Sequence, residues 1–197
     1  MELVLIRHGL PERRDDTDDP PLSSEGHQQS ERVARWLAAD RVDVVVTSPM
    51  LRAVQTAEPY LRLSGLEPEV HTDIVEFDRG SGAYVPFEVL KREDYAAWQA
   101  LVAGEGVDIA AFHKLVVAAL EQIIASHSGR NVAVFCHGGV INVWTAHVLG
   151  LAPRLFFEPG YASIHRYLCA RSGQRNVVSL NERAHLREDV ARLVAAQ

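Results

Sequence analysis

The sequence predicts an α/β protein, a three-layer α/β/α sandwich in which helices cover both faces of a mainly parallel central sheet. Short apolar runs of strand type alternate with longer segments of helical periodicity along the chain. The strongest of these runs are rich in Val, Leu and Ile without polar alternation, as in strands that are buried on both faces. With 197 residues, 47% of them hydrophobic and 23% charged, we expect one domain over 1–197.

The first half of the chain contains strands and helices in alternation. Its expected strands are Glu2–Ile6, Val42–Val46 and, at an edge, Glu69–His71. The polar, proline-rich stretch 10–24 is expected to be a loop, with Ser23 or Ser24 capping the next helix. Thr47-Ser48-Pro49 is expected to cap a second helix, with the proline in its first turn.

The second half repeats this alternation and then changes to an antiparallel pair. Its expected elements are a helix over Val107–Ser126, a strand over Asn131–Cys136, a helix over Gly138–Leu149, and strands over Ser163–Cys169 and Asn176–Leu180. The last two strands are predicted to pair across the turn Arg171–Gln174. The tail from Glu182 is expected to form a polar amphipathic helix.

The segment 76–106 is the least regular part of the chain. Residues that break regular structure, Gly80, Ser81, Gly82 and Pro86, occur beside the aromatic residues Tyr84, Phe87, Tyr95 and Trp98. We interpret the segment as a lid-like insertion that includes a helix near Glu88–Val102 and folds over the site. The alternative is that these aromatic side chains only pack a small satellite core.

Composition argues against several classes of partner. The chain has 20 Lys and Arg against 26 Asp and Glu, a net charge of −6, whereas nucleic acids and anionic membranes require a basic surface. Cys136 and Cys169 lack metal-type spacing, and no apolar run approaches the ~20 residues of a membrane span. We therefore expect a cytoplasmic protein without signal peptide, nucleic-acid partner or membrane partner; a homodimer is left open.

Three strands end in residues with reactive or cationic side chains. These ends are Arg7-His8-Gly9, Ser48 to Arg52, and His137-Gly138-Gly139. In parallel sheets, sites form beyond the carboxyl ends of the strands. If these ends are neighbours, two imidazoles and two guanidinium groups converge into a cationic site that suits a tetrahedral oxyanion.

This combination of groups also suits covalent catalysis. A neutral imidazole is a competent nucleophile, and the charges of Arg7 and Arg52 should lower its pKa. The backbone N–H groups after His137 add donors, and Gly138 lets an anion approach closely. The alternative for each strand-end histidine, taken alone, is a structural hydrogen bond.

Five segments of this sequence form a recognisable series. They are Arg7-His8-Gly9, Asp19 to Gln29, Thr47 to Ala57, Glu76 to Gly80, and His137-Gly138-Gly139. In these motifs and their order, over about 1–149, the chain resembles the histidine phosphatase superfamily, also called the phosphoglycerate mutase-like family. The resemblance implies the phosphoglycerate mutase-like α/β fold.

The resemblance also implies roles for the site residues. His8 would attack phosphorus and form a phosphohistidine, while Arg7, Arg52 and His137 would hold the phosphoryl oxygens. The leaving alkoxide needs a proton, and Glu76 occupies the family position for this acid. Asp78 and Glu12 are its rivals. Ser48 would either contact the phosphate or cap the helix.

We therefore expect a metal-independent phosphomonoester hydrolase without a cofactor, acting on a small phosphorylated metabolite. The alternatives are a phosphoglycerate mutase-type phosphoryl transfer and a non-catalytic phosphate-binding module. The remaining seven histidines show no ligand spacing, and Cys136 ends an apolar strand, so we expect neither a metal site nor a cysteine nucleophile.

Overall fold

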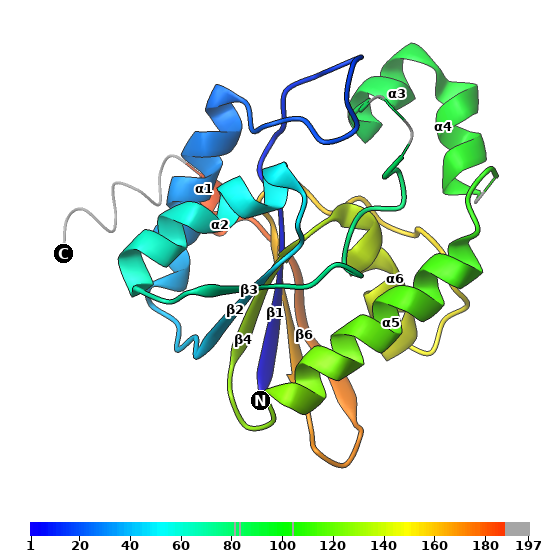
Figure 1. The fold of residues 1–197 in the computed structure, drawn as a ribbon. Helices are drawn as coiled ribbons and strands as arrows, with labels where there is room; N and C mark the ends of the chain where they lie inside the picture. The colour runs from blue at the N-terminus through cyan, green and yellow to red at the C-terminus, as the bar shows by residue number, and fades with distance from the viewer. Residues whose placement is uncertain (81, 83, 104, 188–197) are drawn as a thin grey trace.

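The computed structural model describes residues 1–80, 82, 84–103 and 105–187. A six-stranded sheet in the order β3-β2-β4-β1-β5-β6 crosses the molecule (Figure 1). Its strands are β1 (Glu2–Arg7), β2 (Val44–Thr47), β3 (Pro68–Val70), β4 (Val132–Cys136), β5 (Ile164–Cys169) and β6 (Arg175–Glu182). Strands β1 to β4 run parallel to one another, whereas β5 pairs antiparallel with both of its neighbours, β1 and β6. The mainly parallel sheet is confirmed.

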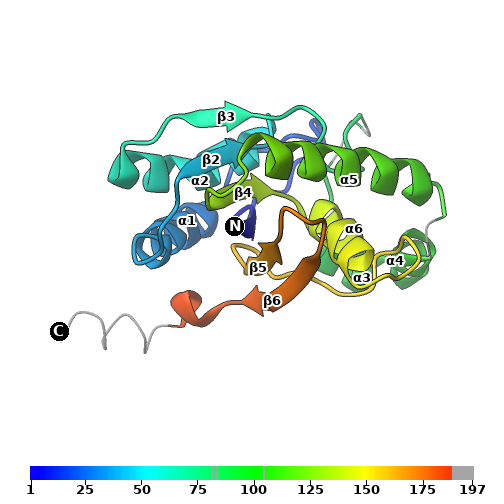
Figure 2. The same cartoon turned by 90° about the horizontal axis from the view of Figure 1, so that it is seen from below.

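Helices cover both faces of this sheet (Figure 2). They are α1 (Ser24–Leu37), α2 (Leu51–Ser64), α3 (Phe87–Glu93), α4 (Tyr95–Val102), α5 (Ile109–Ser126) and α6 (Gly138–Val148). Along β1, Val4 and Ile6 pack in a core with α1 and α2, whereas Leu3 and Leu5 pack in a second core with α5 and α6. This alternation of strand side chains produces the predicted three layers.

The sheet register brings the three reactive strand ends together. Because β4 lies between β1 and β2, Arg7 pairs with Cys136 on one side and Thr47 pairs with Phe135 on the other. The backbone of His8 then donates to the Cys136 carbonyl at 3.0 Å. The residues that follow all three strands therefore leave the sheet at one edge.

The start of α2 differs from the prediction. The helix begins at Leu51, so Thr47-Ser48-Pro49 precedes it rather than capping it. The backbone N–H of Leu51 donates instead to the Asp19 carboxylate, at 2.9 Å from its nearer oxygen. A loop that is distant in sequence thus caps this helix, which local residue patterns cannot show.

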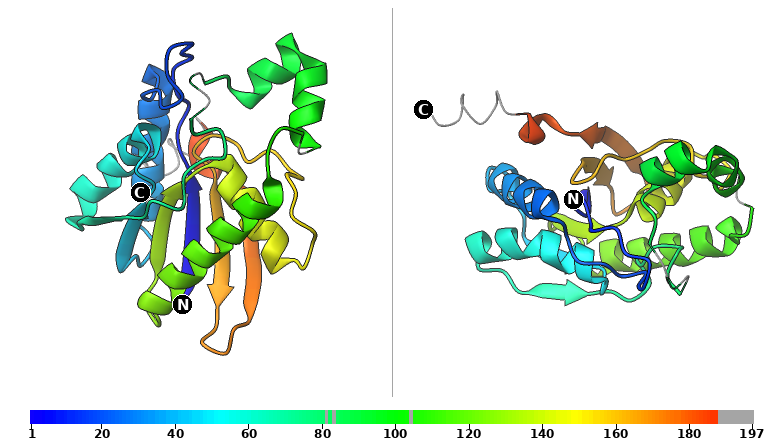
Figure 3. Two further views of the ribbon diagram at one scale, coloured as in Figure 1. Left: turned by 45° about the vertical axis from the view of Figure 1, so that its right-hand side comes forward. Right: turned by 90° about the horizontal axis from the view of Figure 1, so that it is seen from above.

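The single helix expected near Glu88–Val102 is also wrong, because two helices cover this range. Asp94 separates them with non-helical backbone, and its carboxylate accepts from the backbone N–H of Ala97 at 2.9 Å as the cap of α4. Figure 3 shows α3 and α4 on the side toward which the parallel strands point. They pack against each other and bury none of their residues fully.

The C-terminal region differs from the prediction in its first residues. Glu182 ends strand β6, and a short 3-10 helix follows at Ala184–Leu186, so the amphipathic helix does not start at Glu182. The backbone of β6 pairs with β5 as far as Glu182, and this pairing overrides the helical pattern. The rest of that predicted helix, 188–197, lies outside the described residues.

Helix α5 is the most apolar of the long helices. Over 18 residues its mean hydropathy is 1.5, which by length and composition is enough to cross a membrane. In this fold, one face of α5 packs in the core with the sheet and α6 through Val116, Leu120 and Ile123. The apolar residues of α5 thus have a structural role in the fold.

Candidate active site

His8 follows β1 directly and is almost fully buried, with 1% of its surface exposed. Its Nδ1 lies 2.8 Å from the carbonyl of Gly9, and its Nε2 lies 3.3 Å from the donating Nε of Arg52. A carbonyl only accepts, so Nδ1 carries the ring proton and Nε2 keeps its lone pair. This tautomer presents Nε2 as a nucleophile.

The surroundings of His8 disfavour its protonated form. Burial lowers the pKa of His8 well below its usual value, and the positive charges of Arg52 and Arg7 lower it further. The ring of His137 lies 5.3 Å from that of His8, centroid to centroid. His8 is therefore neutral at pH 7.

Two glycines allow the loop after His8 to pack tightly against the start of α1. A Cβ atom on Gly9 would lie 2.7 Å from the carbonyl oxygen of Gly26, and one on Gly26 would lie 2.1 Å from that of Leu10. Both contacts are too short for any side chain. The backbone N–H of Gly9 also donates to Thr56 on α2 at 2.9 Å, so two helices hold the loop in place.

Arg52 is fully buried beside His8, in the first turn of α2. One terminal nitrogen donates to the Asp18 carbonyl at 2.8 Å, and the other lies 3.4 Å from Asp78. Asp19 lies 3.6 Å from the guanidinium group. The polar loop over 10–24 thus places two of its aspartates against the site.

Arg7 is the last residue of β1 and directly precedes His8. Its guanidinium group donates to the carbonyl of Pro159 and lies 4.0 Å from the ring centroid of Tyr161. Its Nε is buried and has no hydrogen-bond partner among the described residues. A buried donor without a partner costs free energy, about 1–3 kcal/mol, unless a ligand satisfies it.

His137 directly follows β4 and also has a buried ring nitrogen without a partner among the described residues. Its Nε2 lies 2.8 Å from the Ser48 hydroxyl, while its Nδ1 is buried without a partner in the described part of the chain. The Ser48 oxygen accepts from the backbone N–H of Met50 at 3.3 Å. The structure thus places Ser48 behind His137, where it orients the ring.

Glu76 is the first residue of the insertion over 76–106, and its side chain is buried. Its carboxylate accepts from the backbone of Gly139 at 2.9 Å and from that of Phe77 at 3.2 Å. Burial, and then the nearby charge of Asp78, raise the pKa of Glu76 to about 7. A Cβ on Gly139 would lie 2.2 Å from Glu76, so only glycine leaves room for this carboxyl.

The two rivals of Glu76 occupy different surroundings. Asp78 is bonded to Arg52, and burial raises its pKa. Glu12 is exposed and lies 3.9 Å from Arg14. Glu76 is buried, whereas Asp78 is half-buried and Glu12 is exposed.

Tyr161 is a site residue that sequence reasoning missed. Its ring lies 5.6 Å from His8, and its hydroxyl lies 3.3 Å from that of Tyr84 and 3.5 Å from Glu88. Tyr84 in turn lies under Arg52, with 4.8 Å between the guanidinium carbon and the ring centroid. The only available signal for Tyr161 was its position in the loop just before β5, the neighbour of β1.

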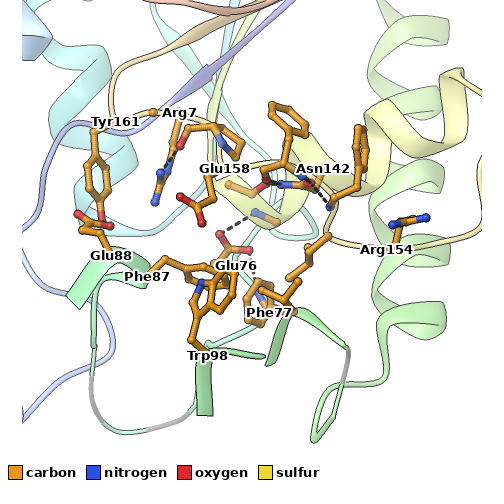
Figure 4. A pocket seen from close by; sticks show the side chains of 18 of the residues that line it. Arg7, Glu76, Phe77, Phe87, Glu88, Trp98, Asn142, Arg154, Glu158 and Tyr161 are labelled. Carbon is orange, nitrogen blue, oxygen red and sulfur yellow. Dashed lines mark hydrogen bonds between the residues drawn. The ribbon is translucent and has the colours of Figure 1, made fainter. Parts of the chain in front are cut away.

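A cavity of about 680 Å³ opens beside these residues, with Arg7, Glu76 and Gly138 in its wall (Figure 4). The insertion supplies part of the wall through Phe87, on α3, and Trp98, on α4. Among the described residues, no group of three or more His, Cys, Asp or Glu side chains is arranged to hold a metal ion. The site can therefore bind a phosphoryl group at its cationic end and an organic group in the cavity.

Comparison with known proteins gives a consistent family. The family model of the histidine phosphatase superfamily (branch 1) matches residues 3–183. Phosphoserine phosphatase 1 of Hydrogenobacter thermophilus is 28% identical over 202 residues, covering 95% of each chain. Glucosyl-3-phosphoglycerate phosphatase of Mycolicibacterium vanbaalenii is 30% identical over 168 residues, 76% of this chain and 74% of that one.

Solved structures share the fold. A phosphoserine phosphatase from Entamoeba histolytica, in complex with 3-phosphoglyceric acid, superimposes with a TM-score of 0.76 at 23% identity, over 94% of this chain and 99% of the other. The Bacillus stearothermophilus protein YhfR has a TM-score of 0.79 at 20% identity, over 94% and 99% of the two chains. At these identities the similarity shows the fold alone.

Proposed function

The chain belongs to the histidine phosphatase superfamily, branch 1, and on this premise we propose that it is a metal-independent phosphomonoester hydrolase acting through a phosphohistidine. Its substrate in this proposal is a small phosphorylated metabolite. One observation carries the proposal: two buried nitrogens, Arg7 Nε and His137 Nδ1, have no hydrogen-bond partner in the described part of the chain, and they belong to the two residues that flank His8. With a proton on each, these nitrogens suit the oxygens of a phosphoryl group.

In the first step, Nε2 of His8 attacks phosphorus, and the bond from phosphorus to the ester oxygen breaks. Arg7, Arg52 and His137 bind the non-bridging oxygens, where negative charge must be stabilised. In this proposal the Ser48 hydroxyl donates to His137 Nε2, 2.8 Å away, and the ring proton of His137 stands on Nδ1, which donates to the phosphoryl group. Protonated Glu76 gives its proton to the departing alkoxide.

In the second step, the carboxylate of Glu76 takes a proton from water as that water attacks the phosphohistidine. The bond between phosphorus and Nε2 breaks, inorganic phosphate leaves, and both His8 and Glu76 return to their starting states. A pKa of about 7 suits Glu76 for both roles, because each protonation state is accessible near neutral pH.

Release of inorganic phosphate from p-nitrophenyl phosphate and from phosphoserine tests the proposal directly. We expect turnover of both by the purified protein. A protein that binds phosphate but releases none from any ester would instead be a binding module. Transfer of the phosphoryl group within 3-phosphoglycerate, without phosphate release, would identify a mutase.

Removal of metal ions is expected to leave the activity unchanged. Two guanidinium groups and an imidazole already supply the donors that a divalent ion would otherwise provide. Activity on p-nitrophenyl phosphate should survive exhaustive EDTA treatment, and vanadate should inhibit because it mimics five-coordinate phosphorus. Complete loss with EDTA, restored by an added metal, would contradict the proposal.

Asp78→Asn is expected to shift the alkaline limb of the pH–rate profile toward lower pH. The charge of Asp78 raises the pKa of Glu76, so removing that charge lowers the pKa, and Glu76 loses its proton at lower pH. In the pH profile of kcat on an alkyl phosphate, the alkaline limb should move by on the order of one pH unit. Asp73→Asn, in an exposed part of the same loop, is the control and should leave the limb in place. An unshifted limb in Asp78→Asn would exclude this coupling.

A further inference from the structure

The wall of the cavity is unusually aromatic. Arg7 and Glu76 lie at its catalytic end, and six aromatic side chains line it: Phe77, Phe87, Trp98, Phe156, Phe157 and Tyr161. Three of them belong to the insertion over 76–106, which includes α3 and α4, and the other three come from the loop between α6 and β5. Flat apolar side chains of this kind favour a flat apolar ligand.

Trp98 adds a specific donor to this wall. Its indole is held in place, since Tyr95 stacks on the ring at 5.3 Å and the Lys91 ammonium lies 4.4 Å from the ring centroid. Its Nε1 is nevertheless buried without a hydrogen-bond partner among the described residues. Figure 4 shows Trp98 beside Phe87 and Glu76 in the cavity wall. An acceptor on a ligand in this cavity would satisfy the indole N–H.

The acidic side chains of the wall already have partners. The Tyr161 hydroxyl donates to Glu88 at 3.5 Å, and Lys91 pairs with Glu158 at 3.1 Å. An ammonium group on the substrate would have to compete with these interactions. The two remaining charged lining residues, Arg154 and Arg183, are exposed to solvent, which weakens their attraction for a carboxylate. The wall therefore offers little selectivity for an amino acid.

The size of the cavity also favours a ligand larger than an amino acid. A volume of about 680 Å³ lies within the range of roughly 300–1,000 Å³ of pockets that enclose drug-sized ligands. A three-carbon acid would leave most of the aromatic wall uncovered. A ring system would cover it and remove apolar surface from water.

We infer that the preferred substrate is a phosphomonoester whose alcohol carries a flat ring with a hydrogen-bond acceptor at its edge. The ring packs among Phe87, Phe156 and Trp98, and its acceptor binds the indole N–H of Trp98. This inference rests on the proposed phosphatase function and narrows it to a substrate class that differs from phosphoserine.

A matched pair of substrates tests the inference. Adenosine 5′-monophosphate and ribose 5-phosphate lose the same kind of primary alkoxide, but only the first carries a flat ring with acceptors. We expect kcat/KM for phosphate release from the nucleotide to be at least about tenfold higher than from ribose 5-phosphate or phosphoserine. An equal or lower value, in an enzyme that turns over p-nitrophenyl phosphate, overturns the inference and leaves the phosphatase proposal standing. No turnover of any ester overturns both.

Trp98→Phe separates the hydrogen bond from the apolar contact, because it removes the N–H and keeps an aromatic ring. The ratio of kcat/KM for the nucleotide over ribose 5-phosphate should fall roughly three- to tenfold. Trp36→Phe is the matched control. Trp36 lies on α1, is half-buried beside His185 and does not line the cavity, so its variant should keep the ratio. A ratio that is the same in Trp98→Phe and in the wild type contradicts the assigned donor.

Discussion

His8→Ala is expected to reduce phosphatase turnover below detection, because the variant has no group that can form the covalent intermediate. Nε2 of His8 carries the unprotonated lone pair of its ring and accepts from Arg52. In the proposed mechanism His137 cannot replace it, because the His137 ring binds the phosphoryl oxygens. Cys136 cannot replace it either, because it lies in the core and burial raises the pKa of its thiol far above 7. The fold should survive, because His8 lies beyond the end of β1 and outside both apolar cores.

This prediction is tested by trapping the phosphoenzyme and measuring the phosphate that stays bound to the protein. Wild-type protein that is quenched during turnover should carry acid-labile, base-stable phosphate, and His8→Ala should carry none. His27→Ala, an exposed histidine on α1, is the control and should be labelled like the wild type. Thermal unfolding of each variant checks that the fold is intact. Label that persists in the His8 variant would show that another residue is the nucleophile.

Glu76→Gln is expected to lower the rate on alkyl phosphates on the order of 10²–10⁴-fold, the usual range for general acid–base catalysis. An alkoxide leaves poorly without a proton, whereas a nitrophenolate leaves without one. The variant should therefore lose clearly less of the rate of phosphohistidine formation on p-nitrophenyl phosphate. The amide of glutamine keeps the size of the carboxyl and can still accept from the backbone of Gly139.

Single-turnover rates on the two classes of ester measure the effect, with Glu58→Gln, an exposed residue of α2, as the control. The pH profile gives a second readout. Since burial raises the pKa of Glu76 to about 7, wild-type activity on alkyl phosphates should fall as pH rises above that value, and this limb should disappear in the variant. Equal losses on both esters would show that Glu76 is not the acid, and Asp78 and Glu12 would be tested next.

Several features of this protein follow from local residue patterns. The strands β1, β2 and β4 are predicted because runs such as Val42–Val46 are rich in valine and other apolar residues, which is typical of strands buried in a parallel sheet. The grouping of His8, Arg52 and His137 follows from the same reasoning, because the carboxyl ends of parallel neighbours share one edge.

Other features depend on contacts between residues that are distant in sequence. Asp19 belongs to the polar loop over 10–24, yet its carboxylate caps α2, 32 positions further along. Tyr161 approaches His8 only because the chain returns through β5 beside β1. No local pattern contains these contacts.

The sequence by itself determined the fold class, the family and which residues meet at the candidate active site, because periodicity and short motifs are properties of neighbouring residues. Only the tertiary structure decided the raised pKa of Glu76, the position of Ser48 behind His137, and the aromatic cavity, where the indole N–H of Trp98 has no partner among the described residues. The physical reason is that pKa values, unsatisfied donors and cavities depend on which groups exclude water from one another. That exclusion exists only after distant segments have packed together.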